Sequence, residues 1–380
     1  MNGPLKNLLV IDLTRVLVGP YCTMILSDLG ARVIKVEAPE IGDDSRNFGP
    51  FIKDYSAYFM SLNRGKESIA LNLKNSEDKK IFDKILSKAD ILVENFKPGT
   101  LEKWGYGWKN INKKNPKLIY ASASGFGQTG PLRELPAYDM VVQGMGGLMS
   151  VTGQPNSEPT RVGTSIGDIT AGLFTAIGIN AALYERQKTG KGMYIDVSML
   201  DCQIAILENA IARYLSKNEI PKPMGSRHPS IAPFEAFKTK DSYIIIAAGN
   251  NKIFSELCLA LNKKELFENE KFKSNNNRCK NMDELKIIFE KILTAKNTHE
   301  WIDIFTPRKI PCGPINNIKE AVENEQIKAR NMIVKAHHKI IGDFKLAGNP
   351  IKMSSYKDVD TRGEIPDLDQ HREKILKEFT

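Results

Sequence analysis

The chain lacks the residue patterns that most often identify a metal, redox or dinucleotide-binding protein. Its five cysteines form no Cys-x-x-Cys pair, and its five histidines are scattered apart from the adjacent His337 and His338. A disulfide framework or a zinc site is therefore not expected, and we predict free thiols and no metal. The turn after the first expected strand also lacks Gly-x-Gly-x-x-Gly, which disfavours a nicotinamide-dependent dehydrogenase.

Long apolar runs and low-complexity tracts are also missing. No uninterrupted apolar stretch reaches the roughly 18 residues that a membrane span needs, and no basic-then-apolar leader opens the chain. Hydrophobic residues make up 41% and charged residues 26%, which is typical of a soluble globular protein. We therefore expect a cytoplasmic protein with no membrane partner.

The net charge of +9 is not concentrated in one segment. Lysines are spread along the chain, and no nucleic-acid-binding module is evident, so no nucleic-acid partner is predicted. A positive surface of this kind is compatible with a small polyanionic ligand.

Strands and helices are expected to alternate through the first half of the chain. Apolar runs at 8–13 and 31–37 flank a helical stretch at 21–29, and similar units continue to a strand at 193–197. This pattern predicts an α/β fold with a doubly wound, Rossmann-like parallel sheet. A proline-containing break near 221–223 precedes a hairpin and helices of mixed charge, which predicts a smaller α/β domain. The predicted division is a large domain at 1–205, a linker at 206–224, a small domain at 225–318, and a linker with a C-terminal return to the large domain at 319–380.

Asp168 is the most informative single residue. It lies where a long apolar helix is expected to begin, and its helix carries apolar residues at a spacing that predicts burial in the core: Leu173, Ile177, Ala181 and Tyr184. A helix N-terminus stabilises negative charge, which would keep this carboxylate ionised and able to attack an electrophile. The alternative is a plain helix cap, the commoner role of aspartate at this position. The glycine-rich segment 138–153 before it permits close approach of a ligand.

Seven short segments, in their order and spacing, resemble the class III CoA-transferase family. These segments are Thr14–Pro20, Val33–Glu37, Val93–Phe96, Ala137–Asp139, Gly167–Asp168, Lys188–Gly192 and Pro311–Pro314. The family also contains formyl-CoA transferase, carnitine CoA-transferase and α-methylacyl-CoA racemase. Residues 42–46 with 63–64, and 228–241 with 249–251, are similar to the succinate–hydroxymethylglutarate CoA-transferase branch, which moves CoA from succinyl-CoA to dicarboxylic acids such as glutarate.

The resemblance implies an acyl-CoA:carboxylate CoA-transferase in which Asp168 is the nucleophile. The carboxylate would attack the thioester, pass through an aspartyl anhydride and an enzyme-bound thioester, and use CoA as part of its substrate, with no permanently bound cofactor. An interlocked homodimer is implied as well. The CoA contacts implied by matching positions are Val16, Leu17, Leu71, Asn72, Lys74, Asn95, Phe96, Lys97, Lys103, Ala137 and Tyr138.

Three departures from the family pattern concern charge and hydrogen bonding. Ala38 stands where several relatives carry an arginine, which leaves Arg46 or Arg64 as candidate phosphate contacts. Leu17 replaces a glutamine of formyl-CoA transferase, so that side-chain hydrogen bond is lost. Arg227 or His228, in the small domain, could pair with the distal carboxylate of a dicarboxylic substrate.

Two other functions are weighed against the transferase. Racemases of this family carry histidine where this chain has Tyr138, and tyrosine, with an ordinary pKa of about 10, is a poor base at neutral pH. This difference favours the transferase over the racemase. The second alternative is a non-catalytic protein that binds a nucleotide or nucleic acid through its positive charge.

Overall fold

The computed structural model describes residues 2–380, which fold into two compact units. Unit 1 contains the residues up to 149 together with Arg161–Glu219 and Asn324–Thr380. Unit 2 contains Ser150–Thr160 and Ile220–Glu323. The short segment Ser150–Thr160, which the sequence analysis assigned to the large domain, therefore groups with the small unit.

Unit 1 is built on a six-stranded parallel sheet in the order β5-β2-β1-β6-β7-β8. The strands are β1 Leu9–Asp12, β2 Arg32–Glu37, β5 Lys66–Ala70, β6 Ile91–Glu94, β7 Ile119–Ser124 and β8 Tyr194–Ser198. The chain runs outward from β1 through β2 and β5, then returns to the other side of β1 at β6. The predicted doubly wound sheet is confirmed, and its strand order reverses between β1 and β6, where such folds bind ligands.

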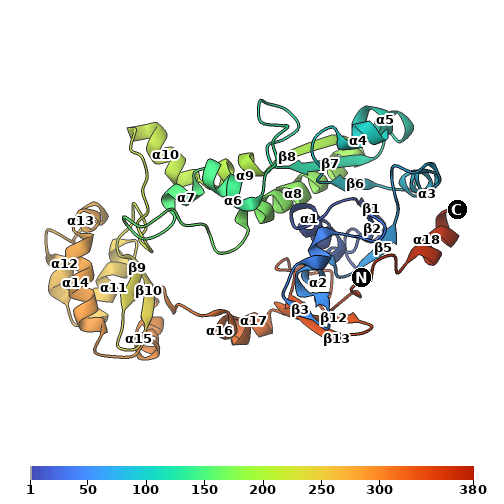
Figure 1. The fold of residues 1–380 in the computed structure, drawn as a ribbon. Helices are drawn as coiled ribbons and strands as arrows, with labels where there is room; N and C mark the ends of the chain where they lie inside the picture. The colour runs from blue at the N-terminus through green and yellow to red at the C-terminus, as the bar shows by residue number, and fades with distance from the viewer. Residues whose placement is uncertain (1) are drawn as a thin grey trace. The chain divides into compact units, whose positions relative to one another are not determined.

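Helices cover both faces of this sheet (Figure 1). One face carries α1 (Val18–Asp28) and α8 (Ile166–Thr189), and the other carries α3 (Ser76–Leu86), α4 (Thr100–Trp104), α5 (Trp108–Lys114) and α18 (Arg372–Phe379). Neighbouring residues of β1 are buried on opposite faces of the sheet: Val10 belongs to the core cluster of α1 and α8, whereas Ile11 belongs to the cluster of α3. Strands buried on both faces are expected to be mostly apolar, and the buried charged residues Asp12, Lys35 and Glu37 are the exceptions in β1 and β2.

Helix α8 buries a different face from the one predicted. Its buried residues include Ala171, Ala176, Ile179 and Ala182, while the predicted core positions Leu173, Ile177 and Tyr184 are 40%, 61% and 63% exposed. The reason is the close approach of α1, since a Cβ added to Gly172 would lie 2.7 Å from the carbonyl oxygen of Val18. Small residues fit this contact, so the large apolar ones point away from it.

By length and composition, α8 is also the one helix among residues 2–380 that could cross a membrane. Half of its most apolar stretch is buried inside the fold.

Unit 1 also contains several shorter elements outside the six-stranded sheet and its covering helices. They are the 3-10 helix Asp44–Asn47, β3 Phe51–Ile52, β4 Tyr55–Ser56, α2 Ala57–Asn63, α6 Asp139–Met145, α9 Met199–Ile206, α10 Glu208–Lys217, α17 Glu325–Ala329, β12 Ile333–His338, β13 Gly342–Ala347 and β14 Thr361–Arg362. The glycine-rich segment 138–153 contains α6 and, towards its end, α7 (Leu148–Val151). Helices α9 and α10 are separated by Leu207 alone.

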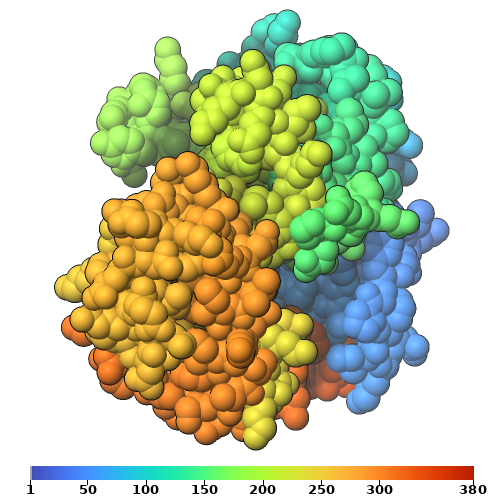
Figure 2. Space-filling model, turned by 90° about the vertical axis from the view of Figure 1, so that its left-hand side faces the viewer, coloured from blue at the N-terminus to red at the C-terminus, as the bar shows by residue number. Residues whose placement is uncertain are grey.

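Unit 2 has its own sheet and its own core. The predicted hairpin is present as β9 (Phe234–Lys238) and β10 (Tyr243–Ala247), and β11 (Cys312–Pro314) adds an antiparallel third strand. The helices are α11 Asn251–Ala260, α12 Lys264–Glu268, α13 Asn275–Lys280, α14 Met282–Leu293, α15 Thr298–Phe305, the 3-10 helix Thr306–Arg308 and α16 Ile318–Glu323. Phe237, Phe254 and Phe289 pack at the centre of this unit, whose yellow and orange residues form a continuous surface in Figure 2.

Candidate active site

The two turns that flank the reversal of strand order are joined by one side chain. Asn95, just after β6, accepts a hydrogen bond from the backbone N–H of Arg15 at 2.9 Å and donates one to the carbonyl oxygen of Arg15 at 2.8 Å. Helix α1 begins at Val18, and Leu17 before it provides no side-chain cap. The first turn of α1 therefore relies on groups other than its own cap residue for its N–H groups.

A cavity of about 440 Å³ lies beside these turns and contains several of the predicted CoA contacts. Leu71, Asn72, Lys74 and Phe96 line it together with Arg15. Carboxylates of the loop after β2 line it as well, so its wall is not uniformly positive. A substrate phosphate would meet cations mainly at Arg15 and Lys74.

The other predicted contacts lie outside this cavity. Val16 and Leu17 belong to the adjoining turn, and Lys97 is an exposed residue whose Nζ lies 3.7 Å from a carboxylate oxygen of Glu134. Lys103 is exposed on α4, and Ala137 and Tyr138 directly precede α6. Their contact with CoA stays a prediction.

Asp168 lies in the first turn of α8, as the sequence predicts. The N–H of Gly167, its neighbour, donates a 2.8 Å hydrogen bond to Oδ1 of Asp139, and Gln143 donates a second one of 2.8 Å to Oδ2 of that residue. Asp139, from the start of α6, thereby caps α8 while Asp168 is left in the same turn without that role. The plain capping role considered for Asp168 belongs to Asp139.

The expectation that Asp168 is fully ionised at neutral pH is wrong. Burial, and to a lesser extent the negative charge of Asp139, raise the pKa of Asp168 to about 7. The cost of removing a carboxylate from water thus exceeds the stabilisation expected from the helix N-terminus. The protonated acid therefore competes with the carboxylate near neutral pH, and the carboxylate that forms is poorly solvated.

The first turn of α8 and the turn predicted to hold CoA contribute residues to the same apolar cluster. Ile169, which follows Asp168, belongs to a cluster with Val16, Leu17 and Tyr58. Burial, and then the negative charges led by Asp168, raise the pKa of Tyr58 to about 12, so its hydroxyl stays protonated at neutral pH. Sequence reasoning missed Tyr58 because its position on α2 carries no local motif, and only the fold brings it near Asp168.

The two arginines proposed to replace the missing phosphate contact are already engaged. Arg64 is 2% exposed and its Nη2 lies 2.7 Å from Oδ2 of Asp28. Arg46 forms two hydrogen bonds of 2.8 Å to Glu37. Arg64 is too buried to reach a phosphate, so that candidate is wrong. Arg15 is the arginine that lines the cavity, and although its Nη1 lies 2.9 Å from a carboxylate oxygen of Asp44, this ion pair is exposed to solvent.

The cations suggested for the distal carboxylate also have partners within unit 2. Arg227 Nε lies 3.0 Å from a carboxylate oxygen of Glu235, and its Nη1 lies 2.5 Å from Asp283. The Nδ1 atom of His228 accepts a hydrogen bond from the N–H of Ser230 at 3.1 Å. Arg227 is therefore a structural ion-pair partner and not a free cation.

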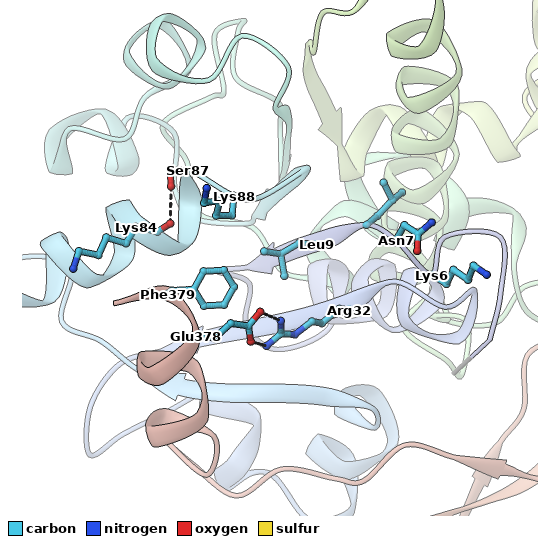
Figure 3. Close-up of a pocket in the computed structure, with 10 residues that line it drawn as sticks. Lys6, Asn7, Leu9, Arg32, Lys84, Ser87, Lys88, Glu378 and Phe379 are labelled. Carbon is cyan, nitrogen blue, oxygen red and sulfur yellow. Dashed lines mark hydrogen bonds and ion pairs between the residues drawn. The ribbon is translucent and has the colours of Figure 1, made fainter.

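A larger cavity, of about 730 Å³, lies at the opposite edge of the sheet (Figure 3). Leu9 and Arg32, which begin β1 and β2, line it together with Phe379, and Arg32 is held there by Glu378. None of the predicted site residues borders it. Ligands of doubly wound folds bind at the carboxyl ends of the strands, so this cavity is separate from the candidate active site.

Comparisons with known proteins agree on one family. The model of CoA-transferase family III matches residues 5–372. The chain is 46% identical to acetyl-CoA:oxalate CoA-transferase of Acetobacter aceti, over 100% of this chain and 96% of that protein. It is 40% identical to human succinyl-CoA:glutarate CoA-transferase, over 99% and 86%. A crystal structure of a CAIB/BAIF family protein from Brucella suis superposes with a TM-score of 0.87 at 37% identity and full coverage of both chains. The chain is therefore an enzyme of CoA-transferase family III.

Proposed function

We propose that this enzyme transfers CoA from an acyl-CoA to a dicarboxylic acid by covalent catalysis at Asp168. The observation that carries the proposal is the position of Asp168: a partly buried carboxylate in the first turn of α8, packed through Ile169 against the turn that contains Val16 and Leu17. The helical turn that carries Asp168 and the turn proposed to bind CoA thus contribute to one apolar cluster. This arrangement supplies the proximity that acyl transfer needs.

The reaction proceeds by four acyl transfers that return the enzyme to its starting state. A carboxylate oxygen of Asp168 attacks the thioester carbonyl and expels CoA thiolate, which leaves a mixed anhydride. The thiolate attacks the aspartyl carbonyl and releases the first acid, which leaves CoA bound to Asp168 as a thioester. The incoming carboxylate attacks this thioester and expels the thiolate again, and the thiolate finally attacks the acyl carbonyl of the second anhydride to form the product and free Asp168.

The acceptor is proposed to be a dicarboxylate and the donor succinyl-CoA. Relatives across this family act on dicarboxylates: oxalate, glutarate and mesaconate appear in the names of three of them. The donor is succinyl-CoA in two of these names and acetyl-CoA in the third. Incubation with either donor and a panel of mono- and dicarboxylic acids, followed by mass spectrometry of the thioesters, tests both choices. New thioesters from monocarboxylic acids alone would contradict the proposal.

A homodimer is proposed to be the working form, and the exposed apolar face of α8 supports it. Ile177 and Tyr184 on α8 are 61% and 63% exposed, and Leu215 on α10 is 74% exposed. No residue of α10 is buried in the single chain. Leu173, Ile177 and Tyr184 recur at helical spacing along α8, and a contiguous exposed apolar patch usually marks a protein interface. Light scattering of the wild type and of Leu215→Glu is the test, and an active wild-type monomer would contradict the dimer.

The racemase alternative is disfavoured at its proton-transfer residue. Position 138 holds a tyrosine that is 74% exposed, where a buried histidine would be needed to form a two-base couple with Asp168. A racemase would exchange the α-hydrogen of a 2-methylacyl-CoA with deuterated water in the absence of any acceptor acid. We expect no such exchange.

A further inference from the structure

Val16, a predicted CoA contact, has an unusual backbone. Its φ is +67°, in the left-handed region that β-branched residues rarely adopt. A glycine would take up this conformation without strain. The turn nevertheless carries valine here, so other groups must hold the backbone in place.

Asp43 is the group that holds Val16. Its Oδ1 accepts the N–H of Val16 at 3.0 Å, and its Oδ2 lies 2.8 Å from Nζ of Lys35. Both charged side chains are fully buried. Ser45 fixes the carboxylate further, since its N–H and hydroxyl donate to the same Oδ1 at 2.9 and 2.7 Å. Asp43 thus reaches Val16 from a separate loop and cannot rotate away without losing several bonds.

The residues before Val16 are held in the same way. Lys35 donates a 2.7 Å hydrogen bond to the carbonyl oxygen of Thr14, and the N–H of Thr14 donates to Oδ1 of Asp12 at 2.8 Å. Asn95 forms the two hydrogen bonds to Arg15 described above. Every backbone N–H and carbonyl group from the N–H of Thr14 to the N–H of Val16 is therefore hydrogen-bonded to a side chain. The turn is therefore fixed before any ligand arrives.

We propose that Asp43 and Lys35 are positioning residues that preorganise the CoA-binding turn by holding Val16 in its left-handed conformation. The proposal rests on the proposed function, because it assigns this turn to CoA. Neither residue needs to touch the substrate. Preorganisation lowers the entropy lost on binding, so its loss should weaken binding of acyl-CoA more than it slows the acyl-transfer steps.

The test is a double-mutant cycle between Asp43→Ala and Val16→Gly. In the Val16 background, Asp43→Ala should raise the KM for succinyl-CoA and the Kd for CoA about tenfold, with kcat within about threefold. In the Val16→Gly background the same substitution should raise both constants by no more than about threefold, because glycine does not need the tether. Equal factors in the two backgrounds would overturn the proposal.

A matched control separates positioning from general loss of stability. Asp28→Asn breaks another buried ion pair, with Arg64, at the far end of α1. It should lower the melting temperature and leave the KM for succinyl-CoA unchanged. If Asp43→Ala does not fold, Asp43→Asn is measured in the same two backgrounds, with the same criterion. If the proposed function is wrong, the wild type will not bind CoA. If only this proposal is wrong, the wild type will bind CoA, but Asp43→Ala will change KM and Kd by the same factor with Val16 and with Val16→Gly.

Discussion

Two neighbouring regions of unit 1 shift the pKa of a buried carboxyl group in opposite directions. Beneath the turn after β1, Asp43 is paired with Lys35, and the lysine lowers the pKa of Asp43 to about 2 despite a burial that acts to raise it. At the start of α8, burial and a like charge raise the pKa of Asp168 to about 7. Paired charges fix the binding turn, whereas the nucleophile lies beside a second negative charge. Burial alone therefore does not decide whether a carboxyl group is ionised, because the neighbouring charges decide whether its pKa is raised or lowered.

The largest expected effect is the loss of the nucleophile. Asp168→Asn keeps the shape of the side chain but cannot form an acyl intermediate, so transfer should fall by at least about 10⁴-fold. CoA transfer is followed by mass spectrometry, and CoA binding by calorimetry serves as the control. Binding should stay within a few-fold of the wild type. Easily measured transfer by this variant would rule out a covalent role for Asp168.

Loss of the ion pair between Lys35 and Asp43 should lower the stability of the protein. Lys35→Met leaves Asp43 as a buried charge without its partner, which should destabilise the protein by about 3–5 kcal/mol. Urea unfolding at pH 7 measures the change. Adding Asp43→Asn to Lys35→Met removes the unpaired charge and should recover part of the loss, and a double variant that is no more stable than the single one would speak against a buried ion pair.

The two regions should show opposite dependence of stability on pH. Asp168 has a folded-state pKa above its unfolded value, so its contribution to stability is complete below about pH 4 and is lost as the pH rises through 7. The difference in free energy of unfolding, Asp168→Asn minus wild type, should therefore be about 2–4 kcal/mol more positive at pH 8 than at pH 4. Asp43 has a lowered pKa, so its contribution is present above about pH 4 and is lost as the pH falls toward 2. If the wild type and Asp168→Asn differed in free energy of unfolding by the same amount at both pH values, the raised pKa would be contradicted.

The smallest expected effect concerns Asp139. The rate should rise with pH around a midpoint near 7, because the ionised form of Asp168 is the nucleophile. Asp139→Asn removes the like charge and should move the midpoint of kcat/KM to lower pH. The comparison needs substrates whose own groups do not titrate between pH 6 and 8. A midpoint that stays in place would show that burial alone raises the pKa.

The alternation of strands and helices could be predicted from the sequence because several strands of unit 1 are short runs rich in apolar residues. Residues 8–13 and 31–37, for example, correspond to β1 and β2. The position of Asp168 in the first turn of a helix could be predicted as well, since a carboxylate before a long apolar stretch is a local feature. Both predictions depended on residues that are neighbours in the sequence.

What could not be predicted depends on long-range contacts. The buried face of α8 was misassigned because its partner α1 demands small residues, which leaves Ile177 exposed. The tether from Asp43 to Val16 joins positions 27 residues apart, and Tyr58 nears Asp168 only through the packing of α2. Arg46 and Arg64 looked available for phosphate because the sequence does not show their carboxylate partners, Glu37 and Asp28.

The central claim is that CoA becomes covalently attached to Asp168 during turnover, and trapping this thioester tests it most directly. The enzyme is mixed with succinyl-CoA, treated with borohydride while it turns over, digested and mapped by mass spectrometry, with Asp168→Asn as the control. Reduction of the aspartyl thioester should convert residue 168 to homoserine in the wild type alone. Continued formation of product with an unmodified peptide at position 168 would contradict the account.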